Sequence, residues 1–502
     1  MNYLGKGLLG GACLLFLPFV AMAQDDKTVT IVLNEELNVL DPCASGQSNI
    51  GRVLQQNISE TMTELNYADG TLMPRLAVSW EPLDDDTWRF KLREGVTFSD
   101  GTAFDADDVK HSIERSLSPD LVCENGVKFF GGIKLTMDSP DPLTIDITAE
   151  PAQPILPLLM SVMTIVPAET PMGEYVRKPI GTGPYVMTSY DVGRSIVLDR
   201  RDDYWGEKPE VTKATYVFRT DDAVRAAMVQ AGEADIVPLI SQVDATNPKT
   251  DFSYPNSETV FLRINETVAP FDDIRVRKAL NMAVDREAFI GTLMPAEATI
   301  ANRLVFPTTL GADEELHSWS YDPEGAKALL AEAKADGVPV DAAITMIGRL
   351  GNFPNVTETM EALQQMYADV GLNVKLNMVE VGEWVERYYR PFADADKPTL
   401  IEAMHDNNRG DPVFSVYFKN ACEGTNSSMC DPELDKLIAE ATGAIGDARA
   451  DAWRKVFRRI DDEVHDVYLF HMVGFSRVSE RLDFKPTIAT NSELQLSQIK
   501  FK

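Results

Sequence analysis

The sequence has few of the residues and motifs that carry catalysis or bind metal ions. Its 502 residues include five histidines, and these are scattered along the chain. The HExxH zinc motif, the GxSxG nucleophile turn and a glycine-rich phosphate loop are all missing from it. We therefore predict that the protein is not an enzyme and uses no cofactor. A secreted hydrolase is the alternative from another functional class.

Long apolar runs are also scarce, and the one at the start of the chain is too short to span a membrane. Lys6 precedes the apolar stretch Leu8–Val20, and residues 21–23 form an A-x-A cleavage signal. A membrane span needs about 20 apolar residues. We therefore predict that residues 1–23 are a cleaved signal peptide and that the mature chain is soluble and periplasmic.

Positive charge is in deficit. The sequence has 47 lysines and arginines against 78 aspartates and glutamates, which gives a formal net charge of −31. An excess of this size repels nucleic acids and anionic membrane surfaces, so we exclude both as partners. It does not fix the charge of a small ligand, because a local pocket can carry either sign.

Cysteine is rare, but the number that remains after export is even. Cys13 lies in the signal peptide, and the mature chain keeps Cys43, Cys123, Cys422 and Cys430. An even count in an exported chain predicts two disulfides, although four cysteines allow three pairings. Cys422 and Cys430 flank a short polar loop and are expected to pair, which leaves Cys43 for Cys123. Zinc is the alternative, but the spacing fits no usual zinc motif and no histidine lies near.

A clear local pattern occurs in residues 179–206. Gly181 and Gly183 sit in the string GTGPY, where we expect glycine to allow a positive φ. Two short strand patterns follow, over residues 185–190 and 195–200, separated by four turn residues. The segment predicts a β-hairpin.

The region before this hairpin reads as strands followed by a helix. Apolar and polar residues alternate over residues 76–80 and 87–93, as in half-exposed strands. A turn at residues 98–102 precedes a helix that runs to about residue 117, with Asp105 or Asp107 as its cap.

The rest of the chain alternates helices with strands. Helical periodicity covers residues 49–66, 222–231 and 356–370, and strand patterns cover residues 234–239 and 373–381. Such alternation predicts an α/β protein.

These patterns together resemble one known family. The strings LAVSWE, FKLREGVTFSDGTAFDADDVKHSIER and GTGPY, in this order, are similar to the signature regions of the family 5 extracellular solute-binding proteins. That family contains the oligopeptide, dipeptide and nickel receptors of ABC importers. The resemblance covers essentially the whole mature chain.

The resemblance implies a two-lobed periplasmic-binding-protein fold of class II, in its large cluster C form with an extra small domain. Two lobes of this kind close on a solute by hinge motion. The implied division places the discontinuous first lobe in residues 24–63, 181–264 and 475–502, the small domain in residues 64–180 and the second lobe in residues 265–474.

The function implied is that of an extracytoplasmic receptor, a monomer that binds a peptide or peptide-like solute and delivers it to a membrane permease. An opine, a sugar-phosphate conjugate or a metal chelate is the alternative solute. A receptor that presents its ligand to a chemoreceptor is a further alternative.

The family's ligand contacts can be carried over at a few positions. Arg349 stands where dipeptide receptors have the arginine that receives the ligand carboxylate. Alignment on Gly410-Asp411-Pro412 leaves Asn408 at the place of the amine-binding aspartate, and Asp406 takes that role only in a shifted register. The opening loop after the first strand is expected near the ligand. The predicted ligand-binding residues are Arg349, Asp406, Asn408, Asp411, Trp384, Ser45 and Gly46.

Overall fold

The structure is a computed structural model that describes residues 27–67, 71–121, 123–312, 316–407 and 409–502. The predicted signal peptide of residues 1–23 lies outside the described residues. Within the described ranges, no helix has both the length and the apolar character that crossing a bilayer requires.

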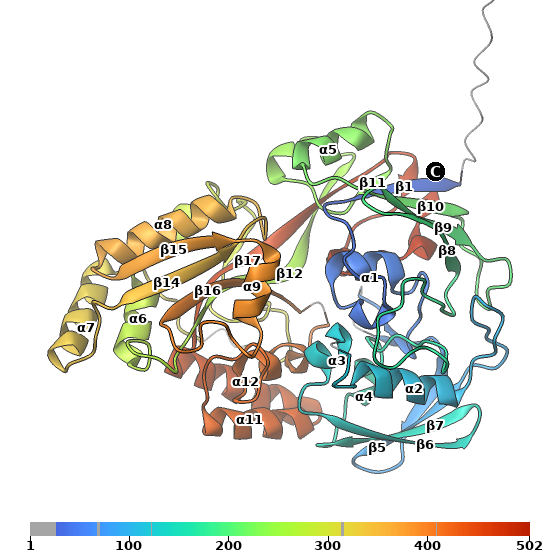
Figure 1. Ribbon diagram of the computed structural model, residues 1–502, viewed down its shortest axis with the longest axis horizontal. Coiled ribbons are helices and arrows are strands. Elements are labelled where there is room, and N and C mark those ends of the chain that lie inside the picture. The colour runs from blue at the N-terminus through green and yellow to red at the C-terminus, as the bar shows by residue number, and fades with distance from the viewer. Residues whose placement is uncertain (1–26, 68–70, 122, 313–315, 408) are drawn as a thin grey trace, which may run out of the picture.

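One long mixed sheet of 11 strands runs through the molecule (Figure 1). Its spatial order is β15 (Asn373–Val379), β14 (Ala343–Arg349), β16 (Thr399–Asp406), β12 (Asp251–Ile264), β17 (Asp466–Val478), β11 (Ile236–Val237), β1 (Thr28–Leu33), β10 (Lys213–Phe218), β9 (Ser195–Arg200) and β8 (Tyr185–Asp191), with β13 (Thr299–Ile300) paired to β17. The α/β prediction is confirmed.

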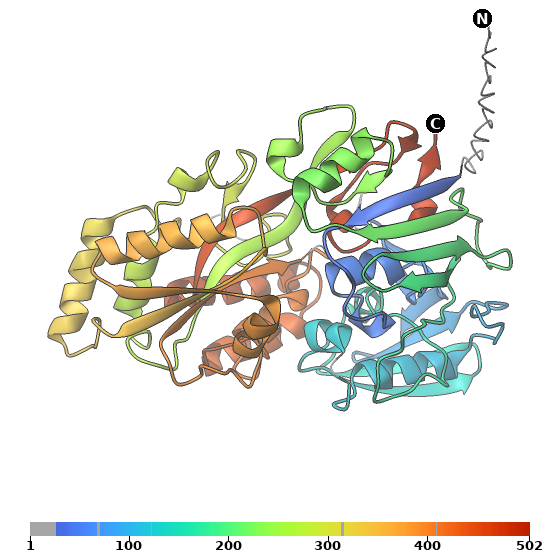
Figure 2. The same ribbon diagram turned by 45° about the horizontal axis from the view of Figure 1, so that its top comes forward.

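Two long strands divide this sheet into two parts. β12 has 14 residues and β17 has 13, and they pair with each other in antiparallel register. β12 leads the chain out of the part with β1 and β8–β11, here called the first body, and β17 leads it back. The part with β14–β16 and the helices from α6 to α12 is the second body. Both views show the two bodies side by side (Figures 1 and 2).

A smaller antiparallel sheet belongs to the first body. Its order is β4 (Ala77–Pro82), β5 (Thr87–Leu92), β7 (Thr144–Glu150) and β6 (Lys134–Asp141). The helices beside it are α2 (Ala106–Ser116), α3 (Glu124–Phe129) and α4 (Leu156–Leu159). Asp105, one of the two predicted candidates, caps α2, and the Asp108 carboxylate accepts the Asp105 N–H to complete a capping box.

The remaining helices cover the large sheet. They are α1 (Ser48–Leu54), α5 (Asp222–Gln230), α6 (Ile274–Met282), α7 (Pro323–Ala335), α8 (Val356–Asp369), α9 (Val381–Tyr388), α10 (Val416–Asn420), α11 (Pro432–Gly443) and α12 (Gly446–Glu463). The expected helix over residues 49–66 is wrong beyond Leu54, because Gln55 is already extended. In the second body, α6, α7 and α8 pack a core on one face of β12, β14 and β16.

The predicted hairpin is confirmed as β8 and β9, but the reason for its glycines differs from our expectation. Neither Gly181 nor Gly183 has a positive φ. A Cβ on Gly181 would lie 2.0 Å from the carbonyl oxygen of Ile58, and one on Gly183 would lie 2.4 Å from that of Asn57. Glycine is needed there because two backbone segments touch.

Candidate functional site

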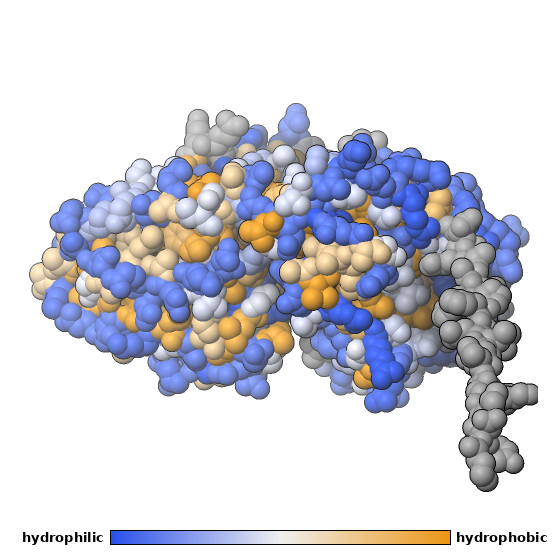
Figure 3. Space-filling view, turned by 90° about the horizontal axis from the view of Figure 1, so that it is seen from above, coloured by the Kyte–Doolittle hydropathy of each residue, from blue (hydrophilic) through white to orange (hydrophobic). Residues whose placement is uncertain are grey.

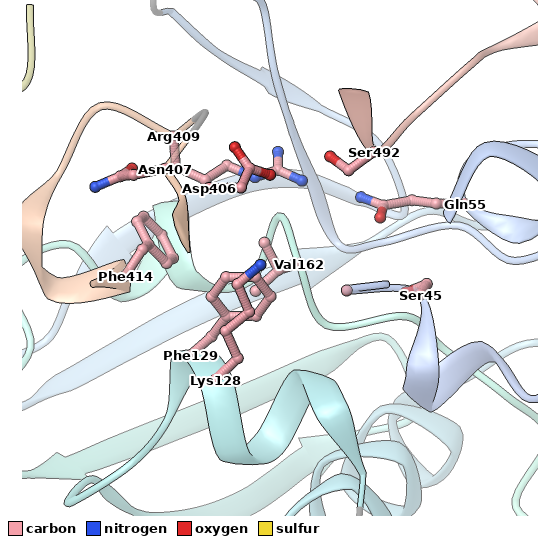
Figure 4. A pocket seen from close by; sticks show the side chains of 11 residues that line it. Ser45, Gln55, Lys128, Phe129, Val162, Asp406, Asn407, Arg409, Phe414 and Ser492 are labelled. Carbon is pink, nitrogen blue, oxygen red and sulfur yellow. The ribbon is translucent and has the colours of Figure 1, made fainter. Parts of the chain in front are cut away.

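A small polar pocket lies where the two bodies meet, at the end of β16. Figure 4 shows Ser45 and Gln55 on one side of it, Asp406 and Arg409 on the other, and α3 below. It is lined by Ser45, Gly46, Gln55, Lys128, Phe129, Val162, Asp406, Asn407, Arg409, Phe414 and Ser492. Its volume is about 10 Å³, which is room for about one water molecule. Both bodies therefore wall the pocket, and they lie close together around it.

The loop that carries Ser45 and Gly46 is held by buried polar contacts. Asp41 caps the short turn Pro42–Ala44, and Arg115 donates to its two carboxylate oxygens at 2.9 and 2.7 Å. Asn125, the second residue of α3, accepts the Gly46 N–H at 2.7 Å and donates to Ser45 Oγ at 3.0 Å. The structure thus fixes both predicted residues at the pocket wall.

Asp406 is the predicted site residue that faces this loop from the second body. It is the last residue of β16, and Ser257 Oγ donates a hydrogen bond to its carboxylate. Ser257 has a φ of 58° and lies where the pairing of β12 with β17 shifts its register, between Pro255 and Thr259. Glu258 follows it, and burial together with the charge of Asp406 raises the pKa of Glu258 to about 7. Asp406 therefore lies beside the point where the pairing of β12 is interrupted, close to the polar side chains of Ser257 and Glu258.

Two cations in the pocket were missed by the sequence analysis. Arg409 lies 3.8 Å from Glu493 and over the ring of Tyr67, and its Nε has no hydrogen-bond partner among the described residues. Lys128 reaches the pocket from α3. Arg409 belongs to the loop that we aligned with the family, so the alignment could have identified it as a candidate ligand contact. Nothing in the sequence indicated such a role for Lys128.

Arg349 and Trp384 lie together but do not line this pocket. The Arg349 guanidinium is 5.7 Å from the Trp384 ring, and its Nε has no hydrogen-bond partner in the described part of the chain. The Trp384 indole N–H donates to the Glu402 carbonyl at 2.8 Å, and its ring stacks on Tyr388. Trp384 is only 6% exposed, so it supports Arg349 from the core of the second body.

Glu402 is hydrogen-bonded to Arg349 as well as to Trp384. Its carboxylate accepts the Arg349 backbone N–H at 3.1 Å and the Asn352 side-chain N–H at 2.7 Å. Burial raises the pKa of Glu402 to about 7.

Asp411, also predicted to bind the ligand, makes a structural contact. Its carboxylate accepts two hydrogen bonds from Arg449, each at 2.9 Å, and it also accepts the Val413 N–H at 3.0 Å. Both residues are buried. The ion pair ties the turn after β16 to α12. Asn408, the other candidate of this loop, lies outside the described residues.

One of the two predicted disulfides is present and the other is not. Cys422 and Cys430 form a disulfide, as predicted. Cys43 and Cys123 do not, which corrects the second pairing: both are buried thiols, and Cys123 Sγ donates to the Cys43 carbonyl at 3.1 Å. The thiol–thiol contact and burial raise the pKa of Cys43. Across the described residues, no group of three or more potential ligands is placed to hold a metal ion.

Comparison with known proteins agrees with this architecture. The dipeptide-binding protein of Escherichia coli strain K12 is 28% identical over 460 residues, which cover 84% of this chain and 85% of that protein. The structure of DppA from Helicobacter pylori in complex with the peptide STSA has a TM-score of 0.82 at 20% identity, covering 94% of this chain and 98% of that one. AgaA of A. tumefaciens R10 in complex with agropinic acid also has a TM-score of 0.82, at 23% identity, covering 95% and 99%.

These likenesses establish the fold as the two-lobed class II form that we expected. The sequence profile of the bacterial extracellular solute-binding proteins, family 5 Middle, matches residues 71–426, which is most of the chain. The chain therefore belongs to the bacterial extracellular solute-binding proteins, family 5.

Proposed function

We propose that this protein is the receptor of an ABC importer for peptides or peptide-like solutes, which it binds between its two bodies and delivers to a membrane permease. One observation carries the proposal: the polar pocket is walled by both bodies and contains charges of both signs, Asp406 against Lys128 and Arg409. A free peptide has the complementary pair, an ammonium and a carboxylate. The similarity to the E. coli dipeptide-binding protein supports the same solute class.

Within this proposal, Asp406 receives the ligand ammonium and Arg349 receives the carboxylate. The unpartnered Nε of Arg349 and its support by Trp384 favour that role, because a guanidinium binds a carboxylate through two parallel hydrogen bonds. Ser45 and Gly46 contact the ligand from the first body. Asn408 is proposed as a polar contact of the same loop.

The two bodies act as lobes of a hinge. We assign residues 24–63, 181–264 and 475–502 to one lobe, residues 64–180 to the small domain and residues 265–474 to the other lobe. The long pair of β12 and β17 supports this division, since the chain passes between the bodies in these two strands. A pocket of about 10 Å³ cannot admit a dipeptide unless the bodies separate.

The proposal places the protein in the periplasm as a monomer without catalytic activity, after cleavage of residues 1–23. The family name supports a place outside the cytoplasm. Its protein partner is then the permease. Opines, sugar-phosphate conjugates and metal chelates are the alternative solutes, and an opine and a metal chelate are compared with peptides in the test.

Calorimetric titration with dipeptides, and with an opine and a nickel–histidine complex for comparison, tests the proposal. We expect one or more dipeptides to bind and to raise the melting temperature, because ligand at 100 times its dissociation constant adds about 2.7 kcal/mol of stability. Arg349→Ala is expected to weaken binding, and Arg349→Lys to restore only part of it, since an ammonium cannot reproduce the planar fork. Binding of the opine or the nickel complex alone would refute a peptide receptor.

A further inference from the structure

A second and larger cavity lies beside the polar pocket. Its volume is about 240 Å³. One wall is the segment that follows α3, with Gly131, Gly132 and Ile133, and the facing wall comes from α10 and α11, with Tyr417 and Ile438. The cavity therefore also lies between the first body and the second. Seen from above, the outline of the molecule has a notch between the two bodies (Figure 3). Hydrophilic residues cover much of this face of the molecule.

The two spaces meet at the end of α3. Lys128 and Phe129 line both the polar pocket and the larger cavity. Phe129 packs edge-to-face on Phe414 of the second body, with ring centroids 5.4 Å apart, and the Lys128 ammonium is 5.2 Å from the Phe129 ring. Among the described residues, Lys128 makes no ion pair within 4.0 Å. A ligand held in the polar pocket would thus have a neighbouring space within reach of a side chain.

The walls of the larger cavity are shaped by a close contact between the bodies. The Tyr417 ring lies against the backbone of Gly131 and Gly132, where an added Cβ would come within 2.9 and 2.5 Å of ring atoms. Gly132 also has a φ of 74°, which favours glycine. Burial raises the pKa of Tyr417, and the nearby carboxylates of Asp435 and Glu423 add to the effect. These two acidic residues give the cavity a polar rim around a lining that is otherwise mainly apolar.

We propose that the 240 Å³ cavity is a side-chain subsite that takes a bulky apolar group of the ligand, a branched aliphatic or aromatic side chain, while the ligand's ammonium stays at Asp406 in the polar pocket. This inference rests on the proposed function and narrows its solute class. The size is sufficient, because a cavity of about 150 Å³ lined by apolar side chains holds benzene. Lys128 lies between the two spaces and meets the polar main chain of the ligand.

The test compares two peptides on three proteins. Calorimetric titration with Ala-Ala and Ala-Phe is done on the wild type, on Ala439→Phe and on Glu440→Phe. Ala439 lines the cavity from α11 and is exposed, so a phenylalanine can be placed there without disturbing the core. Glu440 is the next residue of α11, is exposed and does not line the cavity, so it is the matched control.

We expect the wild type and Glu440→Phe to bind Ala-Phe roughly tenfold or more tightly than Ala-Ala, since an apolar pocket discriminates by size to about this degree. Ala439→Phe should lose that preference and keep its affinity for Ala-Ala. An equal affinity of the wild type for both peptides, or an unchanged preference in Ala439→Phe, would overturn the subsite.

A second probe separates this inference from the proposed function. Binding of fluorotoluene, followed by fluorine NMR, reports on the cavity without any peptide. Fluorotoluene bound by the wild type and lost in Ala439→Phe, with neither peptide bound, would support the apolar site and refute the peptide receptor. Fluorotoluene that is not bound by the wild type, or is bound equally by Ala439→Phe, would overturn the subsite.

Discussion

At the scale of single residues, two aspartates five positions apart have different environments. Asp406 lines the pocket between the bodies, whereas Asp411 pairs with Arg449 inside the second body. Asp406→Asn should weaken binding of a dipeptide by tens to thousands of fold, because stranding a ligand charge in a closed cleft costs roughly 2–5 kcal/mol.

Asp411→Asn serves as the contrast. It should leave the affinity nearly unchanged and lower the stability of the unliganded protein by about 3–5 kcal/mol, since Arg449 would stay buried without its partner. Titration calorimetry and thermal unfolding of both variants separate the two roles. A loss of affinity in Asp411→Asn without a loss of stability would contradict this assignment.

Glu402 should make the stability depend on pH. Burial raises its pKa to about 7, whereas an ordinary glutamate has a pKa near 4.3. Between these values the folded state holds a proton that the unfolded state has released, so the free energy of unfolding falls as the pH rises.

Glu402→Gln removes the titrating carboxyl group, and the comparison with the wild type separates its contribution from that of other buried groups. From pH 4.5 to 7, the stability of the wild type relative to Glu402→Gln should decline by up to a few kcal/mol, given about 1.4 kcal/mol per pKa unit. Denaturant unfolding at several pH values measures this. A difference that is constant or that grows with pH would contradict the assignment.

The cysteines give a chemical count. The described residues hold one disulfide and two buried thiols, so the mature protein without residues 1–23, denatured without reductant, should react with two equivalents of a thiol reagent. The native protein should react slowly, because both thiols are buried and the pKa of Cys43 is raised. Peptide mapping without reductant should find Cys422 joined to Cys430. A count of zero would show that Cys43 and Cys123 pair after all.

At the scale of elements, the β8–β9 hairpin is anchored by backbone contact. Gly181→Ala would place its Cβ 2.0 Å from the Ile58 carbonyl oxygen, so we expect a loss of stability on the order of 1–3 kcal/mol from overpacking. Gly382→Ala is the matched control: it lies in α9, and an added Cβ meets no atom within 4 Å. Because alanine favours a helix, this control should be neutral or stabilising. Equal melting temperatures for both variants would contradict the role of Gly181.

At the scale of the whole molecule, the small volume of the polar pocket predicts motion. The described arrangement leaves about 10 Å³ there, so ligand must enter a more open form in which the bodies have turned about β12 and β17. Small-angle scattering should then show a smaller radius of gyration when a bound dipeptide is present. An unchanged radius with a dipeptide that titration shows to be bound would contradict hinge closure.

The sequence by itself determined the features that depend on neighbours along the chain. The Asp105 cap, the β8–β9 hairpin and the Cys422–Cys430 loop are each formed within a few residues. Local dihedral preferences and short loop closures are sufficient for these. The resemblance to the solute-binding family followed from strings of the same local kind. It also brought Ser45, Gly46 and Asp406 into consideration, and the structure places all three at one pocket.

Only the tertiary structure decided which charges face the pocket and which are held internally. Arg449 is 38 positions from Asp411, and Asn125 is 79 from the Gly46 that it fixes. Lys128 reaches the pocket through the packing of α3 between the bodies, a position that no local pattern encodes. The physical reason is that burial makes an unpaired charge costly, so each buried charge needs a partner. Which residue serves as the partner depends on the element that packs beside the charge, and this is set by the tertiary fold.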